Sequence, residues 1–391
     1  MSVSALTQSL AVSRLSLAGL RNRPGSSLVI VLGVACVVGV LLSVLSVAAG
    51  LSHAYENAAD PNNAIILATE AVGEGGSSIS RDTCATLLGA PGVAKGPDGR
   101  AVVDCEALMS LPPTEGFAEG TLLLRGVGAE ALSLRPNFKI VAGRLFHPGL
   151  HELVVGVGAQ NMFGVKVGDS VILPDGEWRI VGAFSSGGGI LESDLVSDAA
   201  TVMASARSEN FNSALVRLET PGAFDEFEHW VMDNPALTVT AERQVDFYAQ
   251  SAAPFMAFFT SLAFFVGAVL AIGALFGSLN VMYGTVRART REIVTLRVFG
   301  FGALPIALSV VIEAMLLSLV GASIGVGCAV LLFNGKQSLA VHTVFELSVT
   351  PYFVAIGFAW ALAIGLAGSL LPALRAVRIP VTEGLRETSM H

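Results

Sequence analysis

The sequence predicts a membrane protein with four transmembrane α-helices and an extracytoplasmic α+β domain between the first two helices. Two observations predict this fold class. The 391 residues are 53% hydrophobic and only 14% charged, with a mean hydropathy of +0.67, which is unusual for a soluble globular protein. The apolar residues are also gathered into long runs, and one long segment rich in Asp and Glu separates the first run from the others.

Four apolar runs are long enough to cross a membrane as helices. A helix needs about 20 apolar residues to span a hydrocarbon core about 30 Å thick, and no backbone polar group can stay unpaired in lipid. Residues 27–51, 255–283, 304–333 and 353–374 meet this length, and none of these runs contains Lys or Arg. The first run is too long for the apolar part of a signal peptide, so we expect it to remain as an anchor.

Charge predicts the orientation, because Lys and Arg near membrane helices collect on the cytoplasmic side. Residues 1–26 carry three arginines and no acid, residues 284–303 carry four arginines and one Glu, and the tail 375–391 carries three arginines. These segments should be cytoplasmic, in the inner membrane of a bacterium. Residues 52–252 hold 12 basic and 26 acidic side chains, so this domain should be periplasmic, and residues 334–352 should form a short exterior loop.

The charge also bears on partners. An acidic exterior domain cannot bind a phosphate backbone, so we expect no nucleic-acid partner. Within residues 1–26, apolar side chains from Val3 to Leu20 recur on one helical face with Arg14 and Arg21 beside them. We expect an amphipathic helix that lies on membrane lipid at the inner surface.

The exterior domain alternates β-type runs with helical stretches, which predicts α+β. Two strand-helix-strand units, at about 60–107 and 211–245, suggest one βαβ-type subdomain that is interrupted by an insert at about 108–210, which should be mostly β. The expected strands and helices of the subdomain are 63–69, 78–88 (helix), 100–105, 213–219, 221–232 (helix) and 237–240. The expected strands of the insert are 121–125, 152–155, 170–173 and 178–184.

Several segments resemble the MacB/FtsX-type permeases of ABC transporters. The motifs are R-T-R-E-I-V-T-L-R-V-F-G at 289–300 and G-S-L-L-P-A-L-R-A-V-R-I-P at 368–380, and V-A-G-R-L-F, E-L-V-V-G-V-G-A, V-G-D-S-V-I-L and W-R-I-V-G-A-F follow one another in the exterior segment. The resemblance implies a type VII, MacB-like ABC architecture. It also implies that a second permease copy, or a paralogue, pairs with this one. The ending at 379–385 departs from the family's commoner pattern.

The sequence contains no P-loop. That motif needs G-x-x-x-x-G-K followed by Ser or Thr, and the one Gly-Lys pair, Gly335-Lys336, is followed by Gln337. The resemblance therefore implies that a separate cytoplasmic ABC ATPase dimer holds ATP and Mg²⁺. We expect this chain to bind no cofactor and to be no enzyme itself.

The segment 284–303 is the expected contact with that ATPase. Its arginines can pair with carboxylates, and its apolar side chains can anchor a partner; the alternative is that the arginines only enforce topology. The expected coupling residues are Arg287, Arg289, Arg291, Glu292, Ile293, Leu296, Arg297, Phe299, Gly300 and Phe301.

Glu313 is an acid well inside the third predicted span, where a charge is costly. In one interpretation it pairs with Arg297 or with an amino-terminal arginine and ties the loop to the helices. In a second, its carboxylate snorkels to the interface or bonds a neighbouring hydroxyl. In a third, it takes part in proton coupling.

Small residues and cysteines give further expectations. Gly273 with Gly277 and Gly321 with Gly325 allow close helix approach, either within one subunit or between two copies. Cys84 and Cys105 fall on a predicted helix and the next strand, where a disulfide and two free thiols are both open. We expect no metal site, because His147 and His151 flank a Pro-Gly turn with no further His or Cys nearby.

The sequence and the resemblance together predict a permease that couples ATP hydrolysis in a partner to movement of its exterior domain, which the family calls mechanotransmission. Such permeases commonly expel substrate through a periplasmic adaptor and an outer-membrane channel, as in efflux. A lipoprotein- or lipid-releasing permease of the Lol type is the runner-up, followed by a signalling permease, similar to FtsX, that activates a periplasmic enzyme. A membrane-anchored hydrolase would need a catalytic constellation outside the membrane, and the sequence suggests none.

Overall fold

The computed structural model describes residues 24–111, 122–135, 137–173, 175–299, 301–340 and 343–378. Most of the predicted amino-terminal helix 1–26, most of the tail 375–391 and Gly300 therefore lie outside the described residues. The chain forms two compact units. A membrane unit contains residues up to Ala48, Phe258–Asn334 and residues from Ser348, and an exterior unit contains Ala49–Ala257 and Gly335–Leu347.

Among the described residues, four helices are long and apolar enough to cross a membrane, and each contains one of the four predicted runs. They are α2 (Pro24–Ala58), α8 (Gln244–Ala288), α10 (Ala303–Phe333) and α11 (Pro351–Val377). All four extend beyond the predicted limits, and two do so by several turns: α2 continues past Leu51, and α8 begins well before Phe255 and passes through Pro254. Hydropathy marks only the apolar part of a helix, and the polar turns that extend it leave no such signal.

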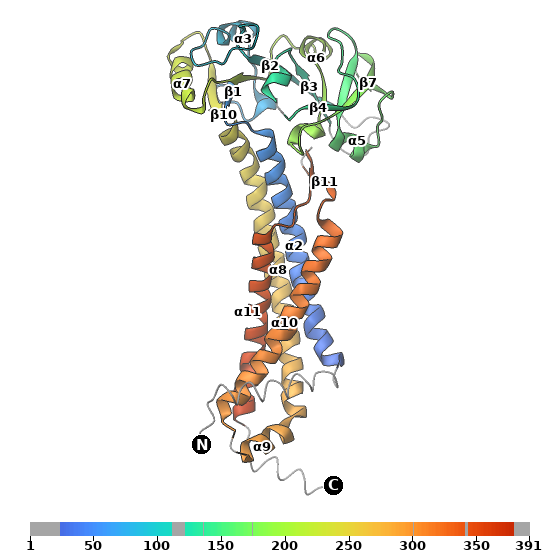
Figure 1. Cartoon of the computed structure of the whole chain (residues 1–391), viewed down its shortest axis with the longest axis vertical. Helices are drawn as coiled ribbons and strands as arrows, with labels where there is room; N and C mark the ends of the chain where they lie inside the picture. Colours follow the sequence, from blue (N-terminus) through green and yellow to red (C-terminus); the bar gives the residue numbers. More distant parts are fainter. Residues whose placement is uncertain are drawn as a thin grey trace. The chain divides into compact units, whose positions relative to one another are not determined.

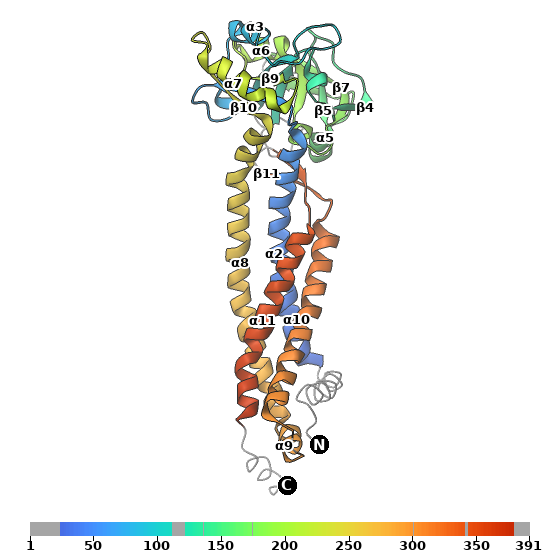
Figure 2. The same ribbon diagram turned by 60° about the vertical axis from the view of Figure 1, so that its left-hand side comes forward.

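Within the membrane unit the four helices run side by side (Figures 1 and 2). In its most apolar 18 residues α2 is 44% buried, whereas α8 is 11% buried. The side chains of Val34, Val38 and Leu42 on α2 lie in the core between the helices. Helix α2 is therefore the centre of the bundle, and α8 is its most exposed member.

The two glycine pairs behave differently. A Cβ atom on Gly321 would lie 2.6 Å from the carbonyl oxygen of Val31, and one on Gly325 would lie 2.6 Å from that of Ala35. Gly321 and Gly325 therefore let α10 approach the backbone of α2. Gly273 and Gly277 on α8 have no atom of another element within 4 Å of such a Cβ. The expectation of helix packing within one chain thus applies to the α10 pair, and the α8 pair faces open space.

The exterior unit is built on one ten-stranded sheet, which confirms the α+β prediction. The sheet has two lobes, which share strand β2. The strands in spatial order are β10 (Val239–Arg243), β1 (Asn63–Ala68), β9 (Ser213–Arg217), β2 (Val103–Leu111), β3 (Leu122–Val127), β8 (Leu195–Asp198), β5 (Glu152–Gly156), β7 (Gly176–Ser185) and β4 (Lys139–Gly143), with β6 (Ser170–Leu173) paired to β7.

The first lobe interleaves two strand-helix-strand units. Helix α3 (Arg81–Leu87) joins β1 to β2, and α7 (Phe224–Asp233), preceded by the 3₁₀ turn η3 (Pro221–Ala223), joins β9 to β10. Strand β9 lies between β1 and β2, and β1 lies between β9 and β10, with all neighbours antiparallel. The expected strand 100–105 was wrong in its limits: β2 begins at Val103, where pairing with β9 begins, and runs on to Leu111.

The second lobe contains more helix than the predicted mostly β insert. Helices α4 (Ala131–Leu134), α5 (Val157–Phe163) and α6 (Ala199–Ala206), the 3₁₀ turn η2 (Ile190–Ser193) and strands β4 and β8 were not predicted. Helix α6 begins where the Asp198 carboxylate accepts a hydrogen bond from the backbone N–H of Thr201. An Asp at the N-cap position is a sequence signal from which the start of this helix could have been predicted. The other elements are no more than seven residues long, which is too short for a periodic pattern to be recognised.

A hairpin of β11 (Gln337–Ala340) and β12 (Thr343–Glu346) occupies the segment that we expected to be a plain exterior loop. It packs within the exterior unit. Ser193 Oγ accepts from the N–H of Val344 at 2.7 Å and donates to its carbonyl oxygen at 3.3 Å. A Cβ on Gly50, in the part of α2 that belongs to this unit, would lie 2.2 Å from the carbonyl oxygen of Glu346. The hairpin is therefore closely packed rather than loose.

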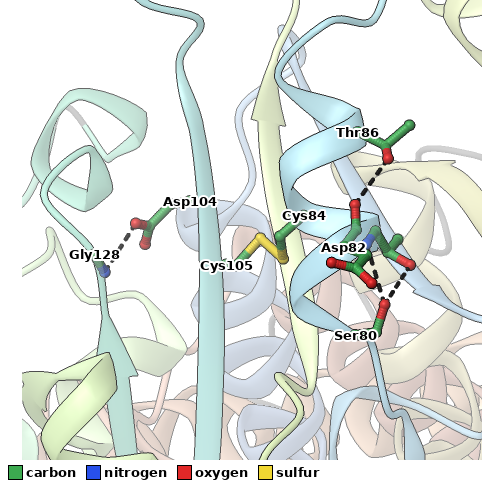
Figure 3. Close-up of a disulfide and its surroundings, with 8 residues drawn as sticks. Ser80, Asp82, Cys84, Thr86, Asp104, Cys105 and Gly128 are labelled. Carbon is green, nitrogen blue, oxygen red and sulfur yellow. Dashed lines mark hydrogen bonds between the residues drawn. A yellow bond between two sulfur atoms is a disulfide. The ribbon is translucent and has the colours of Figure 1, made fainter.

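A disulfide joins Cys84 on α3 to Cys105 on β2, with their Cα atoms 6.4 Å apart (Figure 3). Ser80 begins α3 by accepting a hydrogen bond from the N–H of Thr83. The bond between the cysteines fixes this helix to the shared strand. Between a disulfide and two free thiols, both of which the sequence allowed, the structure has the disulfide.

Buried charges hold the two lobes together next to the shared strand. Arg125 on β3 is 3% exposed and bonds three carboxylates: Glu74 at 3.0 Å, Glu106 at 2.7 Å and Asp194 at 3.0 Å. Glu74 lies in η1 (Glu74–Gly76) of the first lobe, Glu106 lies on β2, and Asp194 immediately precedes β8. A single guanidinium thus bridges both lobes through charge-assisted hydrogen bonds.

Asp104 lies at the same seam, where β2 and β3 diverge. Its Oδ1 accepts a hydrogen bond from the N–H of Gly128 at 2.8 Å (Figure 3), and its Oδ2 has no partner within the described ranges. Burial, and then the nearby Glu106 carboxylate, raise the pKa of Asp104 to about 8. The folded protein therefore favours a proton on this side chain at neutral pH.

We expect the substitution Gly325→Val to separate α10 from α2, because a Cβ at this position would already overlap the Ala35 carbonyl oxygen. The variant should show a lower melting temperature and poorer monodispersity in detergent. Gly277→Val is the matched control, since nothing surrounds that position, and it should melt as the unsubstituted chain does. Equal melting of the two variants would contradict the close α2–α10 contact.

The raised pKa of Asp104 predicts that the folded exterior domain is more stable at acidic pH than at alkaline pH. An unfolded Asp titrates near pH 3.9, so between about pH 4 and pH 8 the folded state binds the extra proton, and stability is lost as the pH rises through that window. Asp104→Asn, which resembles the protonated form, should flatten this loss. Thermal unfolding followed by tryptophan fluorescence from pH 5 to pH 8.5 tests this, and parallel curves for the two proteins would refute it.

Candidate functional site

The segment between α8 and α10 forms a short helix at the end of the membrane bundle (Figure 2). Helix α8 ends at Ala288, α9 covers Thr290–Val298, and α10 begins at Ala303. The break falls at Arg289, whose φ of −105° and ψ of 10° are not helical. Ile293 is 7% exposed and packs among Met282, Val286 and other core side chains. The helix therefore lies against the bundle along one face.

An ion pair ties the start of α9 to the interior of α10. Arg289 Nη1 lies 2.9 Å from Oε2 of Glu313, which is 4% exposed, and Arg289 Nε lies 3.2 Å from Oε2 of Glu292. The prediction that Arg297 is the partner of Glu313 was wrong, and the amino-terminal arginines lie outside the described residues. Arg289 reaches Glu313 because the chain bends out of α8 at that residue, which hydropathy does not reveal.

Arg297 instead ties the end of α9 to α11. Its Nη1 donates a hydrogen bond of 2.7 Å to the carbonyl oxygen of Val377, the last residue of α11. The last carbonyls of a helix lack partners within the helix, and a cation there also suits the helix dipole. Two arginines thus connect one nine-residue helix to two different membrane helices.

The opposite face of α9 is exposed. It presents Arg291, the apolar pair Val298 (63% exposed) and Phe299 (77% exposed), and next to it Arg287 at the end of α8. Not all of the expected apolar anchors are accessible to a partner. Phe299 is exposed, but Leu296 and Phe301 are half-buried. Ile293 is buried in the bundle. Val298 was missed, although helical spacing from Arg291 places it on the same face.

The two histidines near the start of β5 contact different carboxylates: His147 contacts Glu152, and His151 Nε2 lies 3.4 Å from Oδ2 of Asp175. Arg144 and His147 both contact the carboxylate of Glu152, and the hydrogen bond from Arg144 lowers the pKa of Glu152 to about 2. Across the part of the chain that the structure describes, no group of three or more His, Cys, Asp or Glu could hold a metal ion.

Two family models match the sequence and together cover most of it. The model of the MacB-like periplasmic core domain matches residues 26–232. The model of the FtsX-like permease C-terminal region matches residues 261–381, which include α9 and Glu313. The first match alone covers more than half of the chain.

Curated relatives are similar to this chain over part of their length. The pyoverdine export ATP-binding/permease protein PvdT of Pseudomonas fluorescens (strain Pf0-1) is 38% identical over 128 residues, 31% of this chain and 19% of PvdT. The macrolide export ATP-binding/permease protein MacB of Haemophilus ducreyi is 31% identical over 149 residues, 36% of this chain and 21% of that MacB. The chain thus spans only about a fifth of the length of these relatives.

A comparison with solved structures gives a likeness to part of the chain. The similar structure is the extracellular domain of the noncanonic ABC-type transporter YknZ from Gram-positive bacteria, with 15% identity, a TM-score of 0.35 and coverage of 46% of this chain and 100% of that domain. This likeness is too weak to assign a fold. The assignment depends on the two family models, and by them the chain belongs to the MacB-like and FtsX-like permeases of ABC transporters.

Proposed function

We propose that this chain is the transmembrane subunit of an ABC transporter, and that it couples ATP hydrolysis in a separate cytoplasmic ATPase to movement of its exterior domain and export of a substrate. The observation that carries the proposal is the dual character of α9. One face of this helix exposes Arg291, Val298 and Phe299, while its two ends are bonded to α10 and α11 through Arg289 and Arg297.

A helix that transmits force from a partner protein has to be accessible to that partner on one face and firmly attached to the membrane helices on the other. The exposed face meets the first need, because an arginine beside apolar side chains is typical of strong protein contacts. The bonds to Glu313 and Val377 meet the second, because they make α9 move with α10 and α11. Force on α9 would thereby reach three helices, counting α8, from which it continues.

On this proposal ATP binds outside these 391 residues, which contain no P-loop. The relatives PvdT and MacB are named ATP-binding/permease proteins, so ATP binding and permease function are named together in those proteins. On this proposal α9 and its flanking residues face the cytoplasm, a second permease copy or paralogue completes the transporter, and an adaptor and outer-membrane channel receive the substrate.

The chain connections favour transmission to the exterior domain. Helices α2 and α8 are each unbroken across the residues where the two units meet in sequence, near Ala48 and Ala257. Helices α10 and α11 are joined by the β11–β12 hairpin, which belongs to the exterior unit. Every membrane helix is thus covalently continuous with an element of that unit.

We expect the Arg289–Glu313 pair to matter for coupling beyond its effect on stability. Glu313→Ala should lower stability by less than the about 3–5 kcal/mol of a fully buried pair, because Arg289 loses the buried carboxylate 2.9 Å away but keeps Glu292. The double variant Arg289→Met, Glu313→Leu should restore the melting temperature but not substrate-stimulated ATPase activity in the reconstituted transporter. If the double variant is fully active, the pair is only structural.

Phe299→Asp combined with Arg291→Glu should reduce copurification of the ATPase about tenfold or more, since both changes remove exposed groups of the proposed contact. Val72→Asp is the matched control, because Val72 is 94% exposed on the exterior unit. Affinity purification of the tagged permease, followed by quantification of the ATPase, measures the effect. Unchanged copurification in the double variant would overturn the docking surface.

A further inference from the structure

An apolar cavity of about 340 Å³ lies in the exterior domain beside the charge network. Its walls include Leu132 on α4, Phe138, and Leu145 and Phe146 after β4. Protein interiors are normally packed with few voids larger than a water molecule, and a dry apolar cavity of about 150 Å³ already binds benzene. This cavity falls within the range of about 300–1,000 Å³ that is typical of small-molecule sites.

Polar groups with unmet hydrogen bonds lie at one end of the cavity. Arg135, which lines the cavity, donates through Nη2 to Glu106, but its Nε and Nη1 have no partner within the described ranges, and its side chain is 9% exposed. Buried donors without acceptors cost free energy. The arrangement therefore has unused capacity to bind an acceptor.

Asp104 is a second buried polar group near the cavity, behind Gly128. Gly128 also lines the cavity, and its N–H holds Asp104 Oδ1, while Oδ2 has no partner in the described part of the chain. Because burial raises the pKa of this carboxyl, it carries a proton at neutral pH and offers an O–H donor. Asp104 itself lines a neighbouring pocket, so Arg135 is the side chain through which this cavity would bind a polar head group.

The charge balance decides what kind of head group fits. Four carboxyl groups, from Glu74, Asp104, Glu106 and Asp194, surround two guanidinium groups, from Arg125 and Arg135. A carboxylate ligand would add a negative charge to a site that already has more carboxyl groups than guanidinium groups. A neutral group with a strong acceptor, such as a carboxamide oxygen, would satisfy the arginine without adding charge.

We propose that this cavity binds a small amphipathic molecule, with its apolar body against Leu132, Phe138 and Phe146 and a neutral amide head bonded to Arg135. Because Nε and Nη1 of Arg135 are buried, the proposal requires a small shift of this side chain when the head group binds. The site is independent of the proposed coupling to an ATPase, because binding requires neither nucleotide nor a partner.

The test uses the full chain in lipid nanodiscs and 4-(trifluoromethyl)benzamide, observed by fluorine NMR with empty nanodiscs as the blank. The benzamide should bind saturably above the blank, and 4-(trifluoromethyl)benzoate should bind at least about tenfold more weakly, equivalent to about 1.4 kcal/mol. No saturable signal for the benzamide would overturn the site, and tighter binding of the benzoate would overturn the neutral head.

Variants locate the binding in the cavity. Leu132→Trp should fill it and abolish saturable binding, and Arg135→Lys should weaken the benzamide about tenfold. Ile172→Trp, on β6 and away from the cavity walls, is the control and should bind as the unsubstituted chain does. Melting temperatures check that each variant is folded. Unchanged binding in folded Leu132→Trp refutes the proposal even if Arg135→Lys does not fold.

Discussion

A carboxylate buried among apolar helices needs a cationic partner. In the membrane unit, the position of α9 depends on how Glu313 obtains one. The partner, Arg289, does not lie on a neighbouring transmembrane turn but at the break between α8 and α9. For its guanidinium to reach 2.9 Å from Glu313, the chain has to leave α8 at that residue and lie back against the bundle. The position of α9, the burial of Ile293 and the exposure of Phe299 all follow from this bend.

The exterior domain depends on a comparable constraint at strand β2. Residues 103–106 of β2 pair with β9, and residues 107–111 pair with β3, so one strand belongs to both lobes. Hydrogen bonds along one strand would leave the lobes free to twist where β2 and β3 diverge. Arg125 limits that freedom by bonding Glu74, Glu106 and Asp194 from three segments, and the Cys84–Cys105 disulfide fixes α3 to the same strand. The two lobes are therefore fixed to each other at this strand by ion pairs and by a disulfide.

The sequence predicted what depends on composition and on long periodic patterns. The four spans and the α+β exterior were readable because lipid requires long apolar helices and a charged segment cannot lie within it. It did not predict what depends on contacts distant in sequence. Arg297 was a candidate partner of Glu313 and Arg289 was not, and only the geometry of the bend shows that Arg289 reaches the carboxylate. The β11–β12 hairpin escaped notice because its strands are four residues long, and Ile293 was taken for an exposed anchor because an apolar side chain suits a bundle core and a docking surface equally well.

The division of α9 into bonded and exposed groups also explains why its arginines differ in role. The guanidinium groups of Arg289 and Arg297 bond Glu313 and the Val377 carbonyl oxygen, respectively. These two arginines can therefore position the helix but offer little charge to a partner. Arg287 and Arg291 are exposed, so they can attract an acidic surface and also satisfy the preference for positive charge beside a membrane helix. Topology and coupling are therefore compatible explanations of the same arginine-rich segment. On the proposed orientation, the positive charge beside the membrane is also the charge that a partner at α9 would meet, and the two bonded arginines would determine which helices respond to it.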